Sequence, residues 1–213
     1  GTMLLNMRRT LQDLQAQGFN TQRLGALLNS AQDDYDAGNY DLVFTESECK
    51  TRFLRGKGCG AHTLSLGYHP HFTKPAGAPE EKRWDVFFLG IPFPRRQELL
   101  ERLRGRGCRV FPQQEFLFEP LRRAEAIRQS AICLNVHHNE CGVFEKPRLI
   151  ADYLSNGAFV VTETIDHPEG FVHGEHWVAV EYGALEETVM AWLGRPPGER
   201  DRVARAGFEY LRR

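Results

Sequence analysis

The stretch that decides the fold runs from residue 131 to residue 163 and reads AICLNVHHNECGVFEKPRLIADYLSNGAFVVTE. An apolar run ends in Asn135, Val136 and His137, a polar loop and one helix-length segment follow, and a second apolar run begins at Ala158. This order predicts a βαβ unit, with ionisable groups at the carboxyl end of its first strand. In open α/β sheets ligands bind at that end of the strands.

The same pattern continues on both sides of this unit. Further strands are predicted at residues 85–89, 108–111 and 177–180, in addition to 131–136 and 158–162. Their starts are roughly 20–27 residues apart, the spacing that right-handed βαβ crossovers need, and several runs are apolar throughout. We therefore predict an α/β fold, a Rossmann-like doubly wound parallel sheet, closed by helices at 185–193 and 199–212.

A partial α/β layer is predicted before this sheet. Residues 3–28 have a helical pattern, 42–45 and 62–66 are expected strands, and 47–55 is an expected helix. A segment rich in Pro and Gly follows. The predicted organisation is an amino-terminal remnant at 1–66, a linker at 67–83 and a ligand-binding domain at 84–213. Gly1 and Thr2 before Met3 indicate a cloning remnant, so we expect either a short natural protein or a truncation.

Composition excludes several classes of protein. The chain has 213 residues, with 27 Lys and Arg against 28 Asp and Glu, so its charge does not favour a nucleic-acid partner. Five cysteines without C-x-x-C spacing argue against a disulfide framework or a zinc ribbon and favour a cytoplasmic location. No apolar run is long enough for a membrane span.

The segment after the polar loop could bind phosphate. Pro147 suits a first helical turn, Gly157 suits a stop, and a buried apolar stripe would leave Arg148 and Asp152 on another face. A phosphate above the helix start would meet backbone N–H groups and Arg148, and Glu145 could accept hydrogen bonds from a ribose diol. The alternative is that Glu145, Arg148 and Asp152 form surface ion pairs.

At this point the residues resemble the carboxy-terminal half of GT-B glycosyltransferases, in the group related to spore-coat and surface-polysaccharide transferases. The resemblance covers about residues 40–211. It rests on the following segments in this order: DLVFTES at 41–47, LGYHP at 66–70, DVFFLG at 85–90, LNVHH at 134–138, Glu145-x-x-Arg148, and GAFVVTE at 157–163.

The resemblance implies that this half binds a nucleotide-sugar donor and transfers a hexosyl group to a glycan or another hydroxyl acceptor. It implies Gly90 for close backbone approach, Arg96 and Arg148 for phosphate, Asn135 and His137 at the strand end, and Glu145 for ribose. Positive groups at the diphosphate would stabilise the charge that builds there. No cofactor or metal is implied beyond the donor substrate.

The sequence departs from the pattern of that family in two ways. One branch places two glutamates eight positions apart, whereas Glu145 is followed at that offset by Tyr153, so the anomeric outcome is open. Most of an acceptor-binding half is also missing, so no catalytic base can be named. A missing amino-terminal half or a partner chain is an expected partner.

Competing interpretations remain. The alternative function is a non-catalytic module for nucleotide or sugar binding, or for protein assembly.

Adjacent histidines on a strand point to opposite faces, which disfavours a metal site of His137, His138, Glu140 and Cys141. Cys133 suits a small buried apolar position. Residues 56–60 lack Walker spacing, Gly90-x-Pro92 lacks the dinucleotide fingerprint, and the first strand does not end in the acidic cluster of a response regulator. Arg95, Arg122 and Arg123 are expected to be solvated helix charges.

Overall fold

The chain divides into two compact units, residues 1–64 and residues 65–213. The computed structural model describes residues 43–45, 48–56, 58–63, 68, 70, 73, 81–91, 93–112, 119–137, 147–165 and 168–212. The expected helical segment 3–28, most of the expected linker, and Glu145, His138, Glu140 and Cys141 lie outside these residues.

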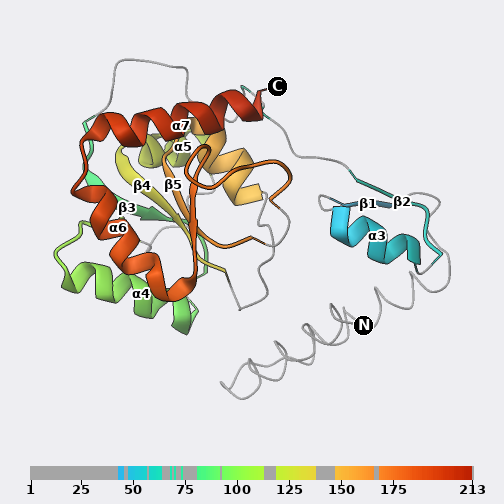
Figure 1. The fold of residues 1–213 in the computed structure, drawn as a ribbon, viewed down its shortest axis with the longest axis horizontal. Helices are drawn as coiled ribbons and strands as arrows, with labels where there is room; N and C mark the ends of the chain where they lie inside the picture. The colour runs from blue at the N-terminus through green and yellow to red at the C-terminus, as the bar shows by residue number, and fades with distance from the viewer. Residues whose placement is uncertain are drawn as a thin grey trace. The chain divides into compact units, whose positions relative to one another are not determined.

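The described part of the first unit is a short βαβ segment (Figure 1). Strand β1 (Val43–Thr45) pairs in parallel with β2 (Ala61–Thr63), and helix α3 (Glu48–Gly56) connects them. The Nε of Arg55 donates a hydrogen bond of 2.7 Å to the carbonyl of Ala61, which ties the end of the helix to β2. This agrees with the strand and helix predicted at 42–45 and 47–55.

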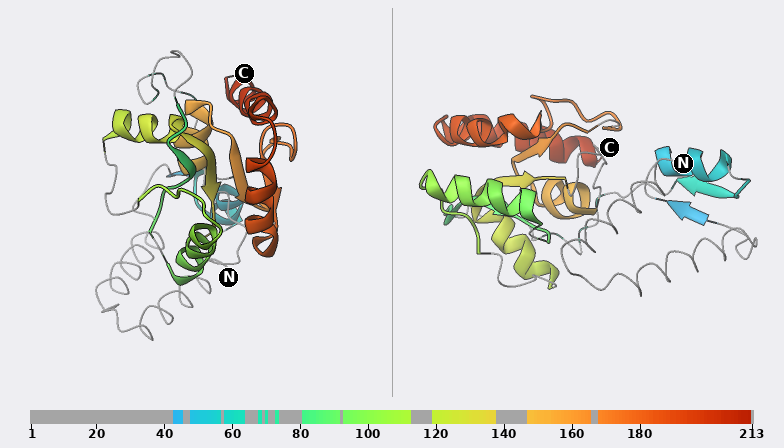
Figure 2. Two further views of the ribbon diagram at one scale, coloured as in Figure 1. Left: turned by 90° about the vertical axis from the view of Figure 1, so that its left-hand side faces the viewer. Right: turned by 90° about the horizontal axis from the view of Figure 1, so that it is seen from below.

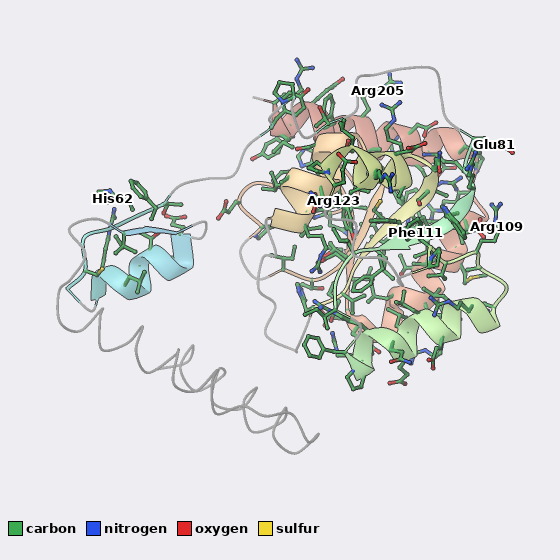
Figure 3. All side chains as sticks on the ribbon, turned by 180° about the vertical axis from the view of Figure 1, so that it is seen from behind. His62, Glu81, Arg109, Phe111, Arg123 and Arg205 are labelled. Carbon is green, nitrogen blue, oxygen red and sulfur yellow. The ribbon has the colours of Figure 1, made fainter. Side chains whose placement is uncertain are left out.

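A four-stranded parallel sheet forms the centre of the second unit, in the spatial order β3-β4-β5-β6. Its strands are β3 (Trp84–Phe88), β4 (Ser130–Asn135), β5 (Val160–Glu163) and β6 (Val178–Val180). The predicted strand at 108–111 is reduced to one parallel bridge, between Val110 and Val86 on the outer edge of β3. There Arg109 pairs with Asp85 at 2.8 Å, and Phe111 contacts Trp84 edge to face (Figure 3).

The chain reverses its direction across the sheet between β3 and β4. After β3, helix α4 (Pro94–Gly105) leads to Val110 on one side of β3, and helix α5 (Pro120–Arg128) then leads to β4 on the other side. A reversal of this kind is a topological switch point, and ligands of open α/β sheets bind outside the strand ends at that point.

Helices cover both faces of the sheet, and Figure 2 shows them on its two sides. Side chains alternate along each strand, so neighbouring strand residues enter different cores. Val86 and Phe88 face the core formed with α4 and α6 (Leu185–Leu193), whereas Phe87 faces the core formed with α5. The doubly wound, Rossmann-like parallel sheet predicted from the sequence is confirmed.

The last helix, α7 (Pro197–Leu211), contributes to both cores. Val203 and Ala204 pack in the core of α4 and α6, and Tyr210 and Leu211 pack against the core of α5. Gly207 lets this helix approach the backbone of His176 closely, because a Cβ at position 207 would lie 2.5 Å from the carbonyl oxygen of His176.

The segment after the polar loop is helical, but it is not the single α-helix that the sequence predicts. It consists of a π-helix, η2 (Pro147–Tyr153), and a 3₁₀ turn, η3 (Leu154–Asn156). The hydroxyl of Ser155 donates to the carbonyl of Ile150, five residues earlier, at 2.7 Å. The helix ends at Gly157 with φ of 65°, as predicted. π-turns occur frequently at functional sites.

Among the described residues, no helix is long and apolar enough to cross a membrane.

Candidate functional site

The candidate site lies at the carboxyl ends of β3 and β4, on both sides of the switch point. Gly90 follows β3, and Asn135 is the last residue of β4. Arg96 comes from the first turns of α4, and Arg148 comes from the first turn of η2. Four of the six residues predicted to bind substrate are therefore within these segments. His137 follows β4, and Glu145 lies outside the described residues.

Gly90 provides the space in which the side chain of Arg148 lies. Its φ is +151°, and a Cβ added there would lie 3.0 Å from Nη2 of Arg148 and 3.2 Å from the ring of Phe88. A side chain at position 90 would thus be strained by the backbone and would also displace the guanidinium. The sequence predicts close approach to this backbone by a ligand, and in the structure the guanidinium of Arg148 approaches it.

Asn135 orients Arg148. The Nη1 of Arg148 donates to Oδ1 of Asn135 at 3.3 Å. Asn135 is fully buried, and its own Nδ2 donates to Oγ1 of Thr162 at 3.0 Å, which fixes the amide with its oxygen toward Arg148. Thr162 in turn donates to the carbonyl of Glu163 at 3.0 Å. The half-buried guanidinium is therefore held by a chain of hydrogen bonds from two strands, and its centre lies 5.7 Å from the ring centroid of Phe88.

Arg96 connects the two sides of the switch point. It is 3% exposed, its Nε donates to the carbonyl of Val136 at 2.9 Å, and its Nη1 donates to the carbonyl of Ile91 at 3.3 Å. It thereby joins the loop after β3 to the end of β4. In this position Arg96 stabilises the backbone on which Gly90 and His137 lie.

Tyr153 makes a second connection between the segment after β3 and the end of β4. Its hydroxyl accepts a hydrogen bond from the N–H of Leu89 at 2.9 Å and donates to the carbonyl of Leu134 at 3.3 Å. Its side chain is fully buried, and this burial raises the pKa of the hydroxyl. The sequence pattern places Tyr153 only in the buried apolar stripe. One signal could have revealed this role: the hydroxyl of a buried tyrosine needs a polar partner.

The prediction that Arg95 is a solvated helix charge is wrong. Both of its terminal nitrogens bond to the carboxylate of Glu163, at 2.6 Å for Nη1, and Nη1 also donates to the carbonyl of His137 at 3.2 Å. Glu163 is 5% exposed. An ion pair between residues 68 positions apart leaves no local pattern in the sequence.

The hydrogen-bonded ion pair of Asp152 is with Arg123, and Arg148 interacts with this carboxylate through its charge. Its carboxylate accepts a hydrogen bond of 2.7 Å from Nε of Arg123 in α5, so Arg123 is also not a simple solvated charge (Figure 3). Burial raises the pKa of Asp152, and the charge and hydrogen bond of Arg123 oppose this shift. The alternative of ion pairs among Glu145, Arg148 and Asp152 therefore differs from the structure in the hydrogen-bonded partner of Asp152, which is Arg123, and the part that involves Glu145 lies outside the described residues.

Among the residues that the structure describes, no cluster of three His, Cys, Asp or Glu side chains could hold a metal ion. Cys133 is buried among apolar side chains, as predicted, and burial raises the pKa of its thiol. A thiol of this kind is not a candidate nucleophile.

Comparison with known proteins identifies the fold. No protein-family model matches the chain, and no curated protein matches its sequence. Among solved structures, that of TarM, a GT-B glycosyltransferase, matches with a TM-score of 0.60 and 8% sequence identity. The match covers 86% of this chain and 42% of that chain, so this chain spans less than half the length of TarM. The α/β fold with a Rossmann-like parallel sheet is thus of the GT-B type.

Proposed function

We propose that this chain contains the donor-binding part of a glycosyltransferase that transfers a hexosyl group from a nucleotide-sugar to a glycan or another hydroxyl acceptor. Two separate observations support the proposal. The fold is of the GT-B type, and an arginine is held over a glycine at the switch point of the sheet. The second observation carries the proposal, because it concerns side chains and not the fold alone.

Arg148 is the group that we assign to the donor diphosphate. A guanidinium presents a planar set of N–H donors that matches two phosphate oxygens at once. Asn135 holds it from one side, and the absence of a Cβ at Gly90 leaves backbone and guanidinium close together. A charged group already oriented in this way needs little rearrangement when negative charge builds on the leaving diphosphate.

The other assigned residues have supporting roles. Arg96 keeps the loop after β3 against the end of β4 through its two backbone carbonyl contacts, so its contribution to phosphate binding is mainly structural. Glu145 remains our proposal for the ribose hydroxyls. No cofactor is part of the proposal: the nucleotide-sugar is a substrate, and the chemistry assigned to this chain is orientation and charge stabilisation.

The first experiment is a thermal-shift titration with UDP, GDP, dTDP, CDP and their sugar conjugates. Binding at a hundred times the dissociation constant adds about 2.7 kcal/mol of stability, which raises the melting temperature by roughly 5–10 °C for a domain of this size. We expect one base to produce this shift and Arg148→Ala to abolish it. Arg148→Lys keeps the charge without the planar fork, so an intermediate shift is expected.

The matched control is Arg205→Ala, because Arg205 is an exposed arginine of α7 (Figure 3). It should leave the shift unchanged. If no nucleotide raised the melting temperature, or if Arg148→Ala behaved like Arg205→Ala, the donor site would not be where we place it. Donor binding without hydrolysis or transfer would favour the non-catalytic binding module.

A further inference from the structure

His137 is held at three of its four polar atoms, by the end of β5 and by Arg95 of α4. Its backbone N–H donates to Oε2 of Glu163 at 2.6 Å, and its carbonyl accepts from Nη1 of Arg95 at 3.2 Å. Its ring Nε2 lies 3.1 Å from the carbonyl oxygen of Thr164. A carbonyl oxygen can only accept, so the proton of this hydrogen bond is on Nε2.

The ion pair that holds His137 joins a buried carboxylate to a half-buried guanidinium, and several contacts fix it in place. Glu163 is 5% exposed and receives both terminal nitrogens of Arg95. The guanidinium of Arg95 lies 3.8 Å from the ring centroid of Tyr182, whose hydroxyl donates to the carbonyl of Arg95 at 2.7 Å. Buried ion pairs contribute little net stability, because removing both charges from water is costly. Specific positioning explains such a pair better than stability does.

The fourth polar atom of His137 is Nδ1. In the tautomer with its proton on Nε2, Nδ1 is a hydrogen-bond acceptor. The residue is 4% exposed, and within the described part of the chain no hydrogen bond to Nδ1 is formed. Buried polar atoms without a partner are rare in folded proteins and need an explanation. His137 lies directly after β4, at the strand end where Arg96 binds Val136 and Arg148 binds Asn135.

We propose that Glu163 and Arg95 are positioning residues of the donor site, which fix His137 so that its Nδ1 accepts a hydrogen bond from a hydroxyl of the transferred sugar. The inference rests on the proposed function and names the part of the donor that this residue recognises. Ionised phosphate oxygens are acceptors and cannot pair with Nδ1, whereas a sugar hydroxyl is a donor. In this proposal Arg148 binds the diphosphate of the donor, and His137 binds its sugar.

The first test follows the ring nitrogens of His137 by ¹⁵N NMR on the full chain without ligand. His137→Gln identifies the signals. In the wild type, Nε2 should be protonated and Nδ1 unprotonated. Glu163→Gln and Arg95→Lys should both produce a mixture of the two tautomers. Glu186→Gln is the matched control. Glu186 of α6 pairs at 2.9 Å with Arg102, which lies on the same helix as Arg95, so this variant also removes an ion pair of α4. It should leave the signals of His137 unchanged.

The second test compares the affinity of each variant for the nucleotide diphosphate and for its sugar conjugate by titration calorimetry. Loss of one hydrogen bond should weaken binding of the conjugate about tenfold in Glu163→Gln and Arg95→Lys. Binding of the diphosphate alone should change much less. A purely structural pair would weaken both ligands equally, or would lower the melting temperature without changing the ratio of the two affinities.

Two results would overturn the proposal: an unchanged tautomer in Glu163→Gln, or equal losses for the diphosphate and the conjugate. If the wild type bound neither ligand, the proposed function and the sugar assignment would both fail. The NMR measurement needs no ligand, so it would still decide whether Glu163 fixes His137.

Discussion

Replacing Gly90 by alanine separates the structural role of this position from its role at the site. The backbone there has φ of +151°, a region almost restricted to glycine, and the strain should cost about 1–3 kcal/mol of stability. The added methyl group would also lie 3.0 Å from Nη2 and 3.2 Å from Cζ of Arg148. The guanidinium is the mobile partner, so it should move and lose its hydrogen bond to Asn135.

The expected loss of binding follows from that displacement. A hydrogen bond to a charged group contributes about 1.5–3 kcal/mol, so Gly90→Ala should weaken binding of the nucleotide diphosphate about 10- to 150-fold. Titration calorimetry measures this loss, and urea denaturation measures the loss of stability.

Gly107→Ala is the control for the backbone term. Gly107 has φ of +87°, and a Cβ there would have no atom within 4 Å. This variant should lose stability in the same range and keep its affinity for the diphosphate. Equal affinities of Gly90→Ala and Gly107→Ala would refute the argument that Gly90 exists to accommodate Arg148.

Two further predictions concern the supports of the site. Tyr153→Phe leaves the N–H of Leu89 without its acceptor and should lower the free energy of unfolding by about 1–3 kcal/mol in urea denaturation. Tyr210→Phe, which loses a single hydrogen bond to the carbonyl of Glu169, should cost less than Tyr153→Phe, and an equal cost would contradict the proposed link. Burial raises the pKa of Asp152 above its ordinary 3.8. The folded state therefore binds this proton more tightly than the unfolded state does. Wild-type stability should consequently fall as pH rises through the folded pKa. Asp152→Asn lacks this term, so its stability relative to the wild type should rise as the pH increases from 3.8 through the folded pKa, and a constant difference would show that Asp152 does not titrate as described.

The sheet could be predicted from the sequence because it depends on local patterns. Apolar runs such as 131–136 and 158–162 have no competing interpretation when helix-length segments separate them. Two elements differ from prediction. Residues 108–111 form one bridge to β3 and not a full strand, since at the edge of a sheet the pairing can stop after any pair of residues. The helix after Pro147 is a π-helix, which no local pattern predicts.

The site was partly predictable. Gly90 and Arg148 could be chosen because each comes directly after a strand or at a helix start, where a short motif is visible. Arg95 and Glu163 could not, because their pairing joins residues 68 positions apart and exists only once β4 and β5 are aligned. The choice of Arg96 over Arg95 shows this limit: adjacent arginines look alike in sequence, and the turn of α4 sends one to backbone carbonyls and the other to a carboxylate.

The contribution of α7 to both cores has a consequence for the order of folding during synthesis. The four strands and the crossover helices can assemble as soon as residues up to about 193 are available, but each core then lacks part of its apolar cover. Residues 197–211 are made after all the strands, and they complete both cores at once. The two faces of the sheet therefore reach their final packing together, and a nascent chain halted before α7 would expose apolar surface to chaperones on both faces.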